Sequence, residues 1–218
     1  ANFVKVLLER YPGIISAVEV LNEDSTISWP DTKWRDAYYY LPILKATYKT
    51  VKSIDPSIIV TTSALWSSPV GYLEDMYALG AKGYFDVLNF HYYPGKNSPK
   101  ENYTWLISHY RKVMQKYGDG AKPIWLTEFG WAIDNEPEGY RPDDNIISPQ
   151  GQSDNMAYVL DASMKSGFVK KAFWYVLYGD DGMTMIHGSD TYNRAATTPR
   201  LNNAISSNDP TLTVVNNV

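Results

Sequence analysis

The regular alternation of short apolar runs with longer helical patterns is the feature that most constrains this fold. The segments with strand character are 14–21, 57–61, 85–90, 124–127 and 172–177. The segments with helical character are 3–11, 38–54, 71–79, 102–117, 151–165 and 199–206. Apolar strands that alternate with helices are typical of a parallel sheet covered by helices. The sequence therefore predicts an α/β fold.

Two parallel architectures fit this pattern: an open, doubly wound sheet, or part of a (β/α)8 barrel. A nucleotide-binding open sheet carries a glycine-rich phosphate loop after a strand. None of the predicted strands is followed by GxGxxG or GxxxxGK[ST]. The strand ends carry instead Asn22-Glu23, His91-Tyr92-Tyr93, Glu128-Phe129-Gly130-Trp131 and Phe173-Trp174-Tyr175. A barrel builds its active-site face from the carboxyl ends of its strands, so these residues favour the barrel.

Composition excludes several classes of protein. The chain has 218 residues, no cysteine and a formal net charge of −4. It therefore has no disulfide framework or thiolate metal site, and its charge argues against a nucleic-acid partner. No apolar run approaches the ~20 residues of a membrane span, so we expect no membrane-spanning helix. No histidine cluster suggests a metal site, and we expect no metal or other cofactor. The lack of cysteine leaves the compartment open, and export is compatible with it. Tyr and Trp number 18 and 7 against 6 Phe, a balance that suits sugars or other flat ligands.

Two glutamates stand at equivalent places, Glu23 after the first predicted strand and Glu128 after the fourth. The carboxyl ends of parallel strands lie at one edge of a sheet, so the two side chains can face one pocket. Glycoside hydrolysis needs such a pair, about 5–5.5 Å apart for retention of configuration and about 6.5–9.5 Å apart for inversion. The alternative for either residue alone is a structural glutamate that caps a helix or pairs with a lysine.

Four segments resemble clan A glycoside hydrolases, with families 39 and 5 about equally similar. Val18–Glu23 resembles the fourth barrel strand, which ends in the acid/base glutamate, and Trp125–Trp131 resembles the seventh, which ends in the nucleophile. Asn89–Tyr93 is similar to the sixth strand, with its His-x-Tyr pattern, and Phe173-Trp174 to the eighth. The resemblance covers residues 1–206 and implies strands four to eight of a TIM barrel. Residues 207–218 are predicted to form a frayed polar tail.

The resemblance also implies roles. Glu23 would be the general acid/base, Glu128 the nucleophile, and Asn22 a ligand of the sugar 2-hydroxyl. Among the remaining substrate-binding candidates, His91 would line the pocket, and Tyr93, or alternatively Tyr92, would donate a hydrogen bond to Glu128. Trp174 would form the floor on which the sugar stacks. Trp66 would be either a platform for a sugar or a residue that packs within its loop. The implied activity is retaining hydrolysis of β-glycosidic bonds in plant or microbial polysaccharides or oligosaccharides. The alternative is a catalytically inactive, carbohydrate-binding fragment or relic.

The sequence departs from the clan pattern in two ways. Asp24 replaces the proline that usually follows the acid/base glutamate; we favour a helix cap for it over a charge that raises the pKa of Glu23. The first three strands of the barrel also have no counterpart, and the chain opens directly on a helical pattern. Five strands cannot close an eight-stranded barrel. We therefore expect a fragment, or else a chain completed by another chain or copy.

Overall fold

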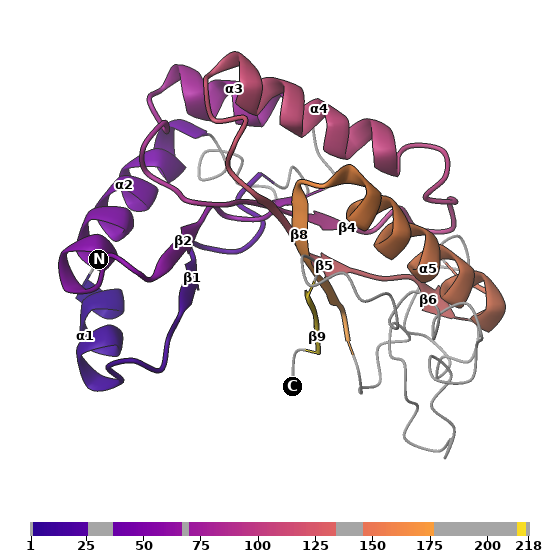
Figure 1. Ribbon diagram of the computed structural model, residues 1–218, viewed down its shortest axis with the longest axis horizontal. Coiled ribbons are helices and arrows are strands. Elements are labelled where there is room, and N and C mark those ends of the chain that lie inside the picture. The colour runs from indigo at the N-terminus through magenta and orange to yellow at the C-terminus, as the bar shows by residue number, and fades with distance from the viewer. Residues whose placement is uncertain (1, 26–36, 67–69, 134–145, 177–212, 217–218) are drawn as a thin grey trace. The chain divides into compact units, whose positions relative to one another are not determined.

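Strands and helices alternate along the chain in the computed structural model, which describes residues 2–25, 37–66, 70–133, 146–176 and 213–216 (Figure 1). Two units are distinguished: Ala1–His91 with Ser108–Ile124, and Tyr92–Ile107 with Trp125–Val218. The boundaries fall inside strand β4 (Leu88–Tyr92), helix α4 (Tyr103–Lys116) and strand β5 (Ile124–Phe129).

The first unit contains two parallel strand pairs. Besides parts of β4 and α4, it contains α1 (Asn2–Arg10), β1 (Ala17–Glu19), α2 (Ala37–Ile54), β2 (Ile59–Thr61), β3 (Leu65–Trp66) and α3 (Val70–Ala78). β1 pairs with β2, and β3 pairs with β4 so that Trp66 lies opposite His91. α1 packs on α2, and α2 packs on α3. Leu44, Val60, Leu73 and Phe90 are fully buried between these elements, because the apolar positions of each helix recur on one face.

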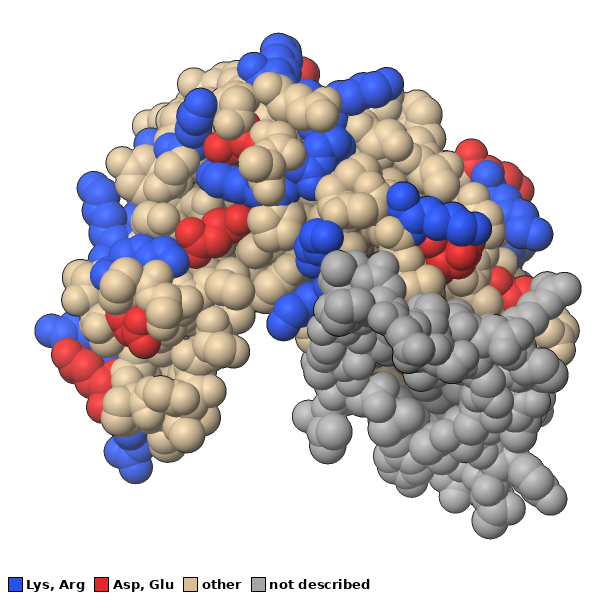
Figure 2. Space-filling view, viewed as in Figure 1, with Lys and Arg blue, Asp and Glu red and all other residues tan. Residues whose placement is uncertain are grey.

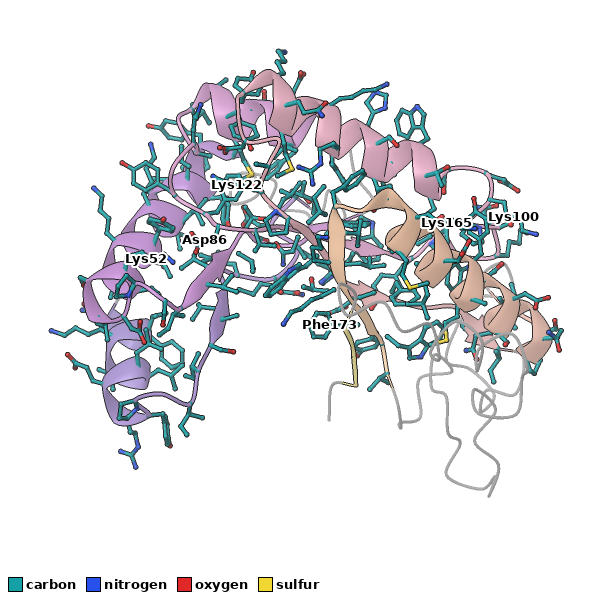
Figure 3. All side chains as sticks on the ribbon, in the orientation of Figure 1. Lys52, Asp86, Lys100, Lys122, Lys165 and Phe173 are labelled. Carbon is teal, nitrogen blue, oxygen red and sulfur yellow. The ribbon has the colours of Figure 1, made fainter. Side chains whose placement is uncertain are left out.

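A charged cluster holds the amino end of β2 in this unit. The Asp86 carboxylate accepts a hydrogen bond from the Val60 amide (2.8 Å) and pairs with the Lys52 ammonium (2.7 Å) (Figure 3). Lys52 also donates to the carbonyl of Ile58 at 2.7 Å. These contacts lie at the end of the strands away from Glu23, where barrels place residues that stabilise the fold.

The second unit is built around a long strand and helix. Its elements are β5 (Ile124–Phe129), β6 (Ala132–Ile133), β7 (Ile146–Ile147), α5 (Pro149–Ser166), β8 (Val169–Trp174) and β9 (Thr213–Asn216). β8 lies between β5 and β9 in the sheet, and β6 pairs in parallel with β7. The Ser148 side chain caps the start of α5, and Gly167 ends the helix with φ of 72°. That left-handed conformation suits glycine, which has no Cβ to clash.

The predicted α/β class is confirmed, and the larger elements lie close to their expected positions. The last predicted strand, expected at 172–177, lies earlier in the chain, at Val169–Trp174 (β8). Its start was missed because the charged Lys170 and Lys171 interrupt the apolar run. Both side chains are half-buried, and the Lys171 ammonium lies 4.6 Å from the centre of the Trp125 ring. The helix predicted at 199–206, and the predicted boundary at 206, lie outside the described residues.

The predicted tail contains a strand. Thr213–Asn216 forms β9 and pairs in parallel with β8, with Phe173 opposite Val215. β-branched residues favour extended backbone, and β8 provides an edge for them, so the expectation of a frayed tail over 207–218 is wrong for these residues.

On the face shown in Figure 2, acidic side chains lie among the basic ones. Of the helices within the described ranges, none combines the length and the apolar character that a membrane crossing requires.

Candidate active site

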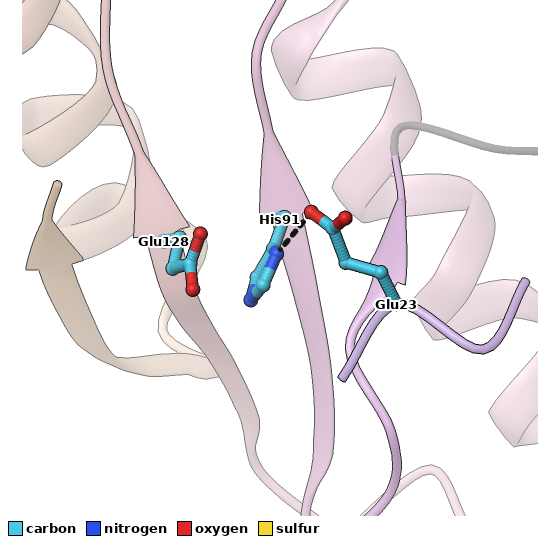
Figure 4. Close-up of side chains that lie close together, drawn as sticks. All are labelled: Glu23, His91 and Glu128. Atoms are coloured by element: carbon cyan, nitrogen blue, oxygen red, sulfur yellow. Dashed lines mark hydrogen bonds and ion pairs between the residues drawn. The ribbon is translucent and has the colours of Figure 1, made fainter. Parts of the chain in front are cut away.

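Glu23 lies on the turn after β1, and its carboxylate contacts His91 near the end of β4. Glu23 Oε1 is 2.8 Å from His91 Nδ1 (Figure 4). The His91 side chain is 1% exposed and that of Glu23 is 23% exposed. A carboxyl–imidazole contact of this length holds one proton on either partner: ionised Glu23 accepts it from Nδ1, or protonated Glu23 donates it to Nδ1. The pair is therefore suited to giving and taking up a proton.

The backbone of this turn adopts an unusual conformation. Leu21 and Glu23 have φ values of 67° and 50°, in the left-handed region that residues with a Cβ rarely occupy. Such residues cost about 1–3 kcal/mol each and persist where the surroundings hold them. Backbone outliers of this kind are concentrated at functional sites, which makes the turn a candidate for one.

Hydrogen bonds to the segment around β3 hold the turn. The Asp24 amide donates to Ser63 Oγ (2.9 Å), and the Trp66 amide donates to Ser25 Oγ (3.0 Å). The Tyr40 hydroxyl accepts a bond from the Ser63 amide, and burial raises the pKa of this phenol, which keeps it neutral. Trp66 thus takes part through its backbone, while its side chain is half-buried at the end of β3. Either interpretation of its ring, platform or packing, is compatible with this position.

The Asp24 carboxylate contacts α3. Its Oδ2 accepts a hydrogen bond of 2.5 Å from the Tyr72 hydroxyl. A helix capped by Asp24 would begin within residues 26–36, which lie outside the described residues, so the helix-cap prediction stays a prediction. The sequence could not reveal this contact, because Tyr72 is far from Asp24 along the chain. Asn22 lies beside Glu23 with an exposed side chain.

Glu128 belongs to the second unit and lies near the end of β5, a strand drawn in Figure 4. Its Oε2 accepts a hydrogen bond of 2.7 Å from the Tyr93 hydroxyl, so the expected contact between these residues is present. Tyr92 points elsewhere: it is buried, and its hydroxyl donates to Asn102 Oδ1 at 2.5 Å. Successive side chains of an extended chain alternate in direction, which explains why Tyr93 and not Tyr92 contacts the carboxylate.

Trp174 lies in an aromatic core beside Glu128. Its ring is 1% exposed, 5.2 Å from Phe129 in an edge-to-face arrangement and 6.3 Å from Trp131 in a stacked one. A ring enclosed in this way has no face for a sugar, so the predicted stacking role of Trp174 does not fit the structure. Trp131 and Trp125 are also buried.

Tyr175 is the aromatic residue that sequence reasoning missed. It is 36% exposed, and its ring lies 6.2 Å from that of Tyr93 at an angle of 88°. Its amide donates to the carbonyl of Phe129 (3.0 Å), and its peptide bond to Val176 is cis. The signal in the sequence was the run Phe173-Trp174-Tyr175, in which adjacent residues point in opposite directions.

Comparison with known proteins supports the hydrolase resemblance. The family model described as glycosyl hydrolase catalytic core matches residues 34–200. The chain belongs to this family. A search of curated protein sequences found no match.

Solved structures of glycoside hydrolases share the fold. A family 39 glycoside hydrolase from Bacteroides cellulosilyticus aligns with a TM-score of 0.63 and 19% identity, over 86% of this chain and 40% of that chain. A family 39 β-xylosidase from Caulobacter crescentus aligns with a TM-score of 0.58 and 15% identity, over 84% of this chain and 39% of that chain. A family 128 exo-β-1,3-glucanase from Cryptococcus neoformans aligns with a TM-score of 0.56 and 17% identity, over 79% of this chain and 63% of that chain. These enzymes are of TIM-barrel type. The glycosyl hydrolase chain described here spans about two fifths of the length of the family 39 structures.

Proposed function

We propose that this protein is a retaining glycoside hydrolase that cleaves β-glycosidic bonds in plant or microbial polysaccharides or oligosaccharides. The observation that carries the proposal is the hydrogen bond of 2.7 Å from the Tyr93 hydroxyl to Glu128 Oε2. It joins residues from two of the motifs that resemble clan A. A hydrogen-bond donor favours the ionised form of a carboxylate, and an ionised carboxylate is what a glycosidase nucleophile requires.

The two glutamates have complementary roles in this mechanism. Glu128 attacks the anomeric carbon while Glu23 gives its proton to the glycosidic oxygen, so that the leaving alcohol departs neutral and a covalent glycosyl-enzyme forms. Glu23, now ionised, then takes a proton from water as that water attacks the anomeric carbon and releases Glu128. Two displacements at one carbon retain its configuration. The carboxyl–imidazole pair of Glu23 and His91 suits the residue that changes protonation twice.

The surrounding residues provide candidates for sugar binding. Asn22 is exposed next to Glu23 and is proposed to bind the 2-hydroxyl at the cleavage point. His91 and Tyr93 border the carboxylates that they contact. Tyr175 takes the stacking role first assigned to Trp174, because its ring is exposed and touches that of Tyr93. An exposed aromatic ring offers the apolar face that stacks on a sugar.

We infer that this chain contributes strands four to eight of the barrel, as β1, β2, β4, β5 and β8. In the described part of the chain, β1 has a single hydrogen-bonded neighbour, β2. Phe3, Val6 and Ile14, which lie on or next to α1, are at least 62% exposed, a concentration of apolar surface that proteins usually cover. Further β/α units of the same protein are the proposed cover. Sedimentation of the 218-residue chain tests this: a defined dimer indicates completion by a second copy instead, whereas the absence of a defined dimer agrees with cover by further units.

The decisive experiment removes the nucleophile. Glu128→Ala should lower kcat on aryl β-glycosides by roughly 10⁵-fold or more, and azide should restore turnover with formation of the inverted glycosyl azide. Glu101→Ala, an exposed acid in the same unit, is the matched control and should retain activity. Wild-type rates in Glu128→Ala would contradict the assignment. Sugar binding by an intact protein that turns over no glycoside would favour the inactive, carbohydrate-binding alternative.

A further inference from the structure

The turn that carries Glu23 is anchored from α3 by a residue pair outside the clan pattern. We propose that Asp24 and Tyr72 are positioning residues, which hold Glu23 where it can protonate the leaving oxygen. This inference rests on the proposed function and concerns only the proton transfer within it. Its starting point is the 2.5 Å hydrogen bond from the Tyr72 hydroxyl to Asp24 Oδ2.

The backbone conformation makes the placement of Glu23 dependent on its neighbours. With φ of 50° at Glu23, the turn has no intrinsic preference for the observed shape. The Asp24 amide is held by Ser63 Oγ, and its carboxylate by Tyr72. Two bonds that act on the residue next to Glu23 therefore oppose relaxation of its backbone to an ordinary conformation.

Tyr72 is itself well placed to act as a fixed donor. It lies on α3 next to Leu73, and Leu73 and Met76 are fully buried. The helix is therefore fixed by its apolar face, while the Tyr72 ring is only half-buried and its hydroxyl reaches the turn. A catalytic group held by residues on a rigid element is placed more accurately than one on a free loop.

The charge of Asp24 gives the bond a second consequence. A hydrogen bond from a phenol favours the ionised form of a carboxyl group, and in that form Asp24 places a negative charge one residue from Glu23. The bond holds that charge at the α3 side of the turn. If the bond is lost, both the position of Glu23 and the position of this charge become variable. The effect should fall on the step in which Glu23 transfers its proton.

The test compares leaving groups in the intact protein. A dinitrophenyl β-glycoside departs with little help from an acid, whereas a phenyl β-glycoside needs protonation. Tyr72→Phe removes only the hydroxyl. It should lower kcat/KM for the phenyl glycoside by about 10- to 100-fold, the value of a hydrogen bond to a charged group, and that for the dinitrophenyl glycoside by about twofold at most. Asp24→Ala should give the same selective loss. Asp24→Asn keeps an acceptor oxygen but not the charge, so it should be faster than Asp24→Ala on the phenyl glycoside.

Tyr48→Phe is the matched control. Its hydroxyl contacts Asp86 at 3.4 Å, in the charged cluster at the other end of the strands. Loss of this hydroxyl should not lower kcat/KM for one glycoside more than for the other. Equal losses on both glycosides in Tyr72→Phe and Asp24→Ala would show that the pair only supports the fold, and unchanged rates in both would show that it does nothing; either outcome overturns the proposal. If Glu23→Ala shows no selective loss, the proposed function itself fails, which separates the two conclusions.

Discussion

The two candidate catalytic glutamates, one in each unit, are held by different kinds of structure. Glu23 lies on a turn after a three-residue strand, with left-handed backbone, and is held by bonds from side chains to backbone groups. Glu128 lies within a six-residue strand, beside the packed rings of Phe129, Trp131 and Trp174. Aromatic packing fixes a position with little dependence on any one polar contact, whereas a bonded turn depends on each bond. We therefore expect the Glu23 region to be sensitive to single polar substitutions and the Glu128 region to loss of packing.

The largest expected effect separates the chemistry of the two glutamates. Glu23→Ala should lower kcat/KM for phenyl β-glycosides by roughly 10²- to 10⁴-fold, with a small effect on dinitrophenyl glycosides. Azide should then yield the glycosyl azide of retained configuration, in contrast to the inverted product from Glu128→Ala. Product stereochemistry by NMR checks this, with Glu19→Ala, at the end of the preceding strand β1, as the control. Inverted azide from the Glu23 variant would reverse the two assignments.

The next prediction concerns packing around Glu128. Trp174→Ala should destabilise the protein by about 3–5 kcal/mol, because it leaves a large cavity in an aromatic core. Tyr175→Ala should cost about 1 kcal/mol or less, since the ring is partly exposed, but should raise KM. Denaturant unfolding and steady-state kinetics on both variants measure this. If both substitutions destabilise equally, the distinction between core and exposed ring is wrong.

A smaller effect is expected from the hydroxyl that contacts Glu128. Tyr93→Phe should lower kcat by about 10- to 100-fold, as expected for a hydrogen bond to an ionised group, with stability almost unchanged. Tyr92→Phe is the matched control: it loses a part-buried hydrogen bond to Asn102, so it should lose about 1 kcal/mol of stability and retain kcat. The opposite pattern would move the role to Tyr92.

The smallest effect tests the bonded turn itself. Ser25→Ala removes the acceptor of the Trp66 amide bond and should cost about 1 kcal/mol in the free energy of unfolding. Ser53→Ala, at an exposed helix position, should stay within about 0.5 kcal/mol. Thermal unfolding of both variants is the measurement. Indistinguishable melting temperatures would show that the turn does not depend on this bond.

Local patterns predicted the parts of the fold that local physics determines. The apolar runs and helical periods indicated β1, α2, β4, α4 and α5, because burial of one helix face or of a whole strand imposes a period on the sequence. The start of β8 was misplaced because Lys170 and Lys171 interrupt the apolar run. Short strands such as β3 and β6 carry too few residues to show any period.

By itself the sequence determined the α/β class and the positions of Glu23 and Glu128 after or near the end of apolar runs, since such patterns are properties of neighbouring residues. The resemblance implied the hydrogen bond to Glu128 from Tyr93, with Tyr92 as the alternative. Only the tertiary structure decided that Trp174 is buried and Tyr175 exposed, that Asp24 binds Tyr72, and that Thr213–Asn216 forms a strand on β8. Each of these depends on which distant segment provides a partner. The free energy of a hydrogen bond or of a buried ring comes from contact with that distant segment. The type of the residue alone does not decide which segment it contacts.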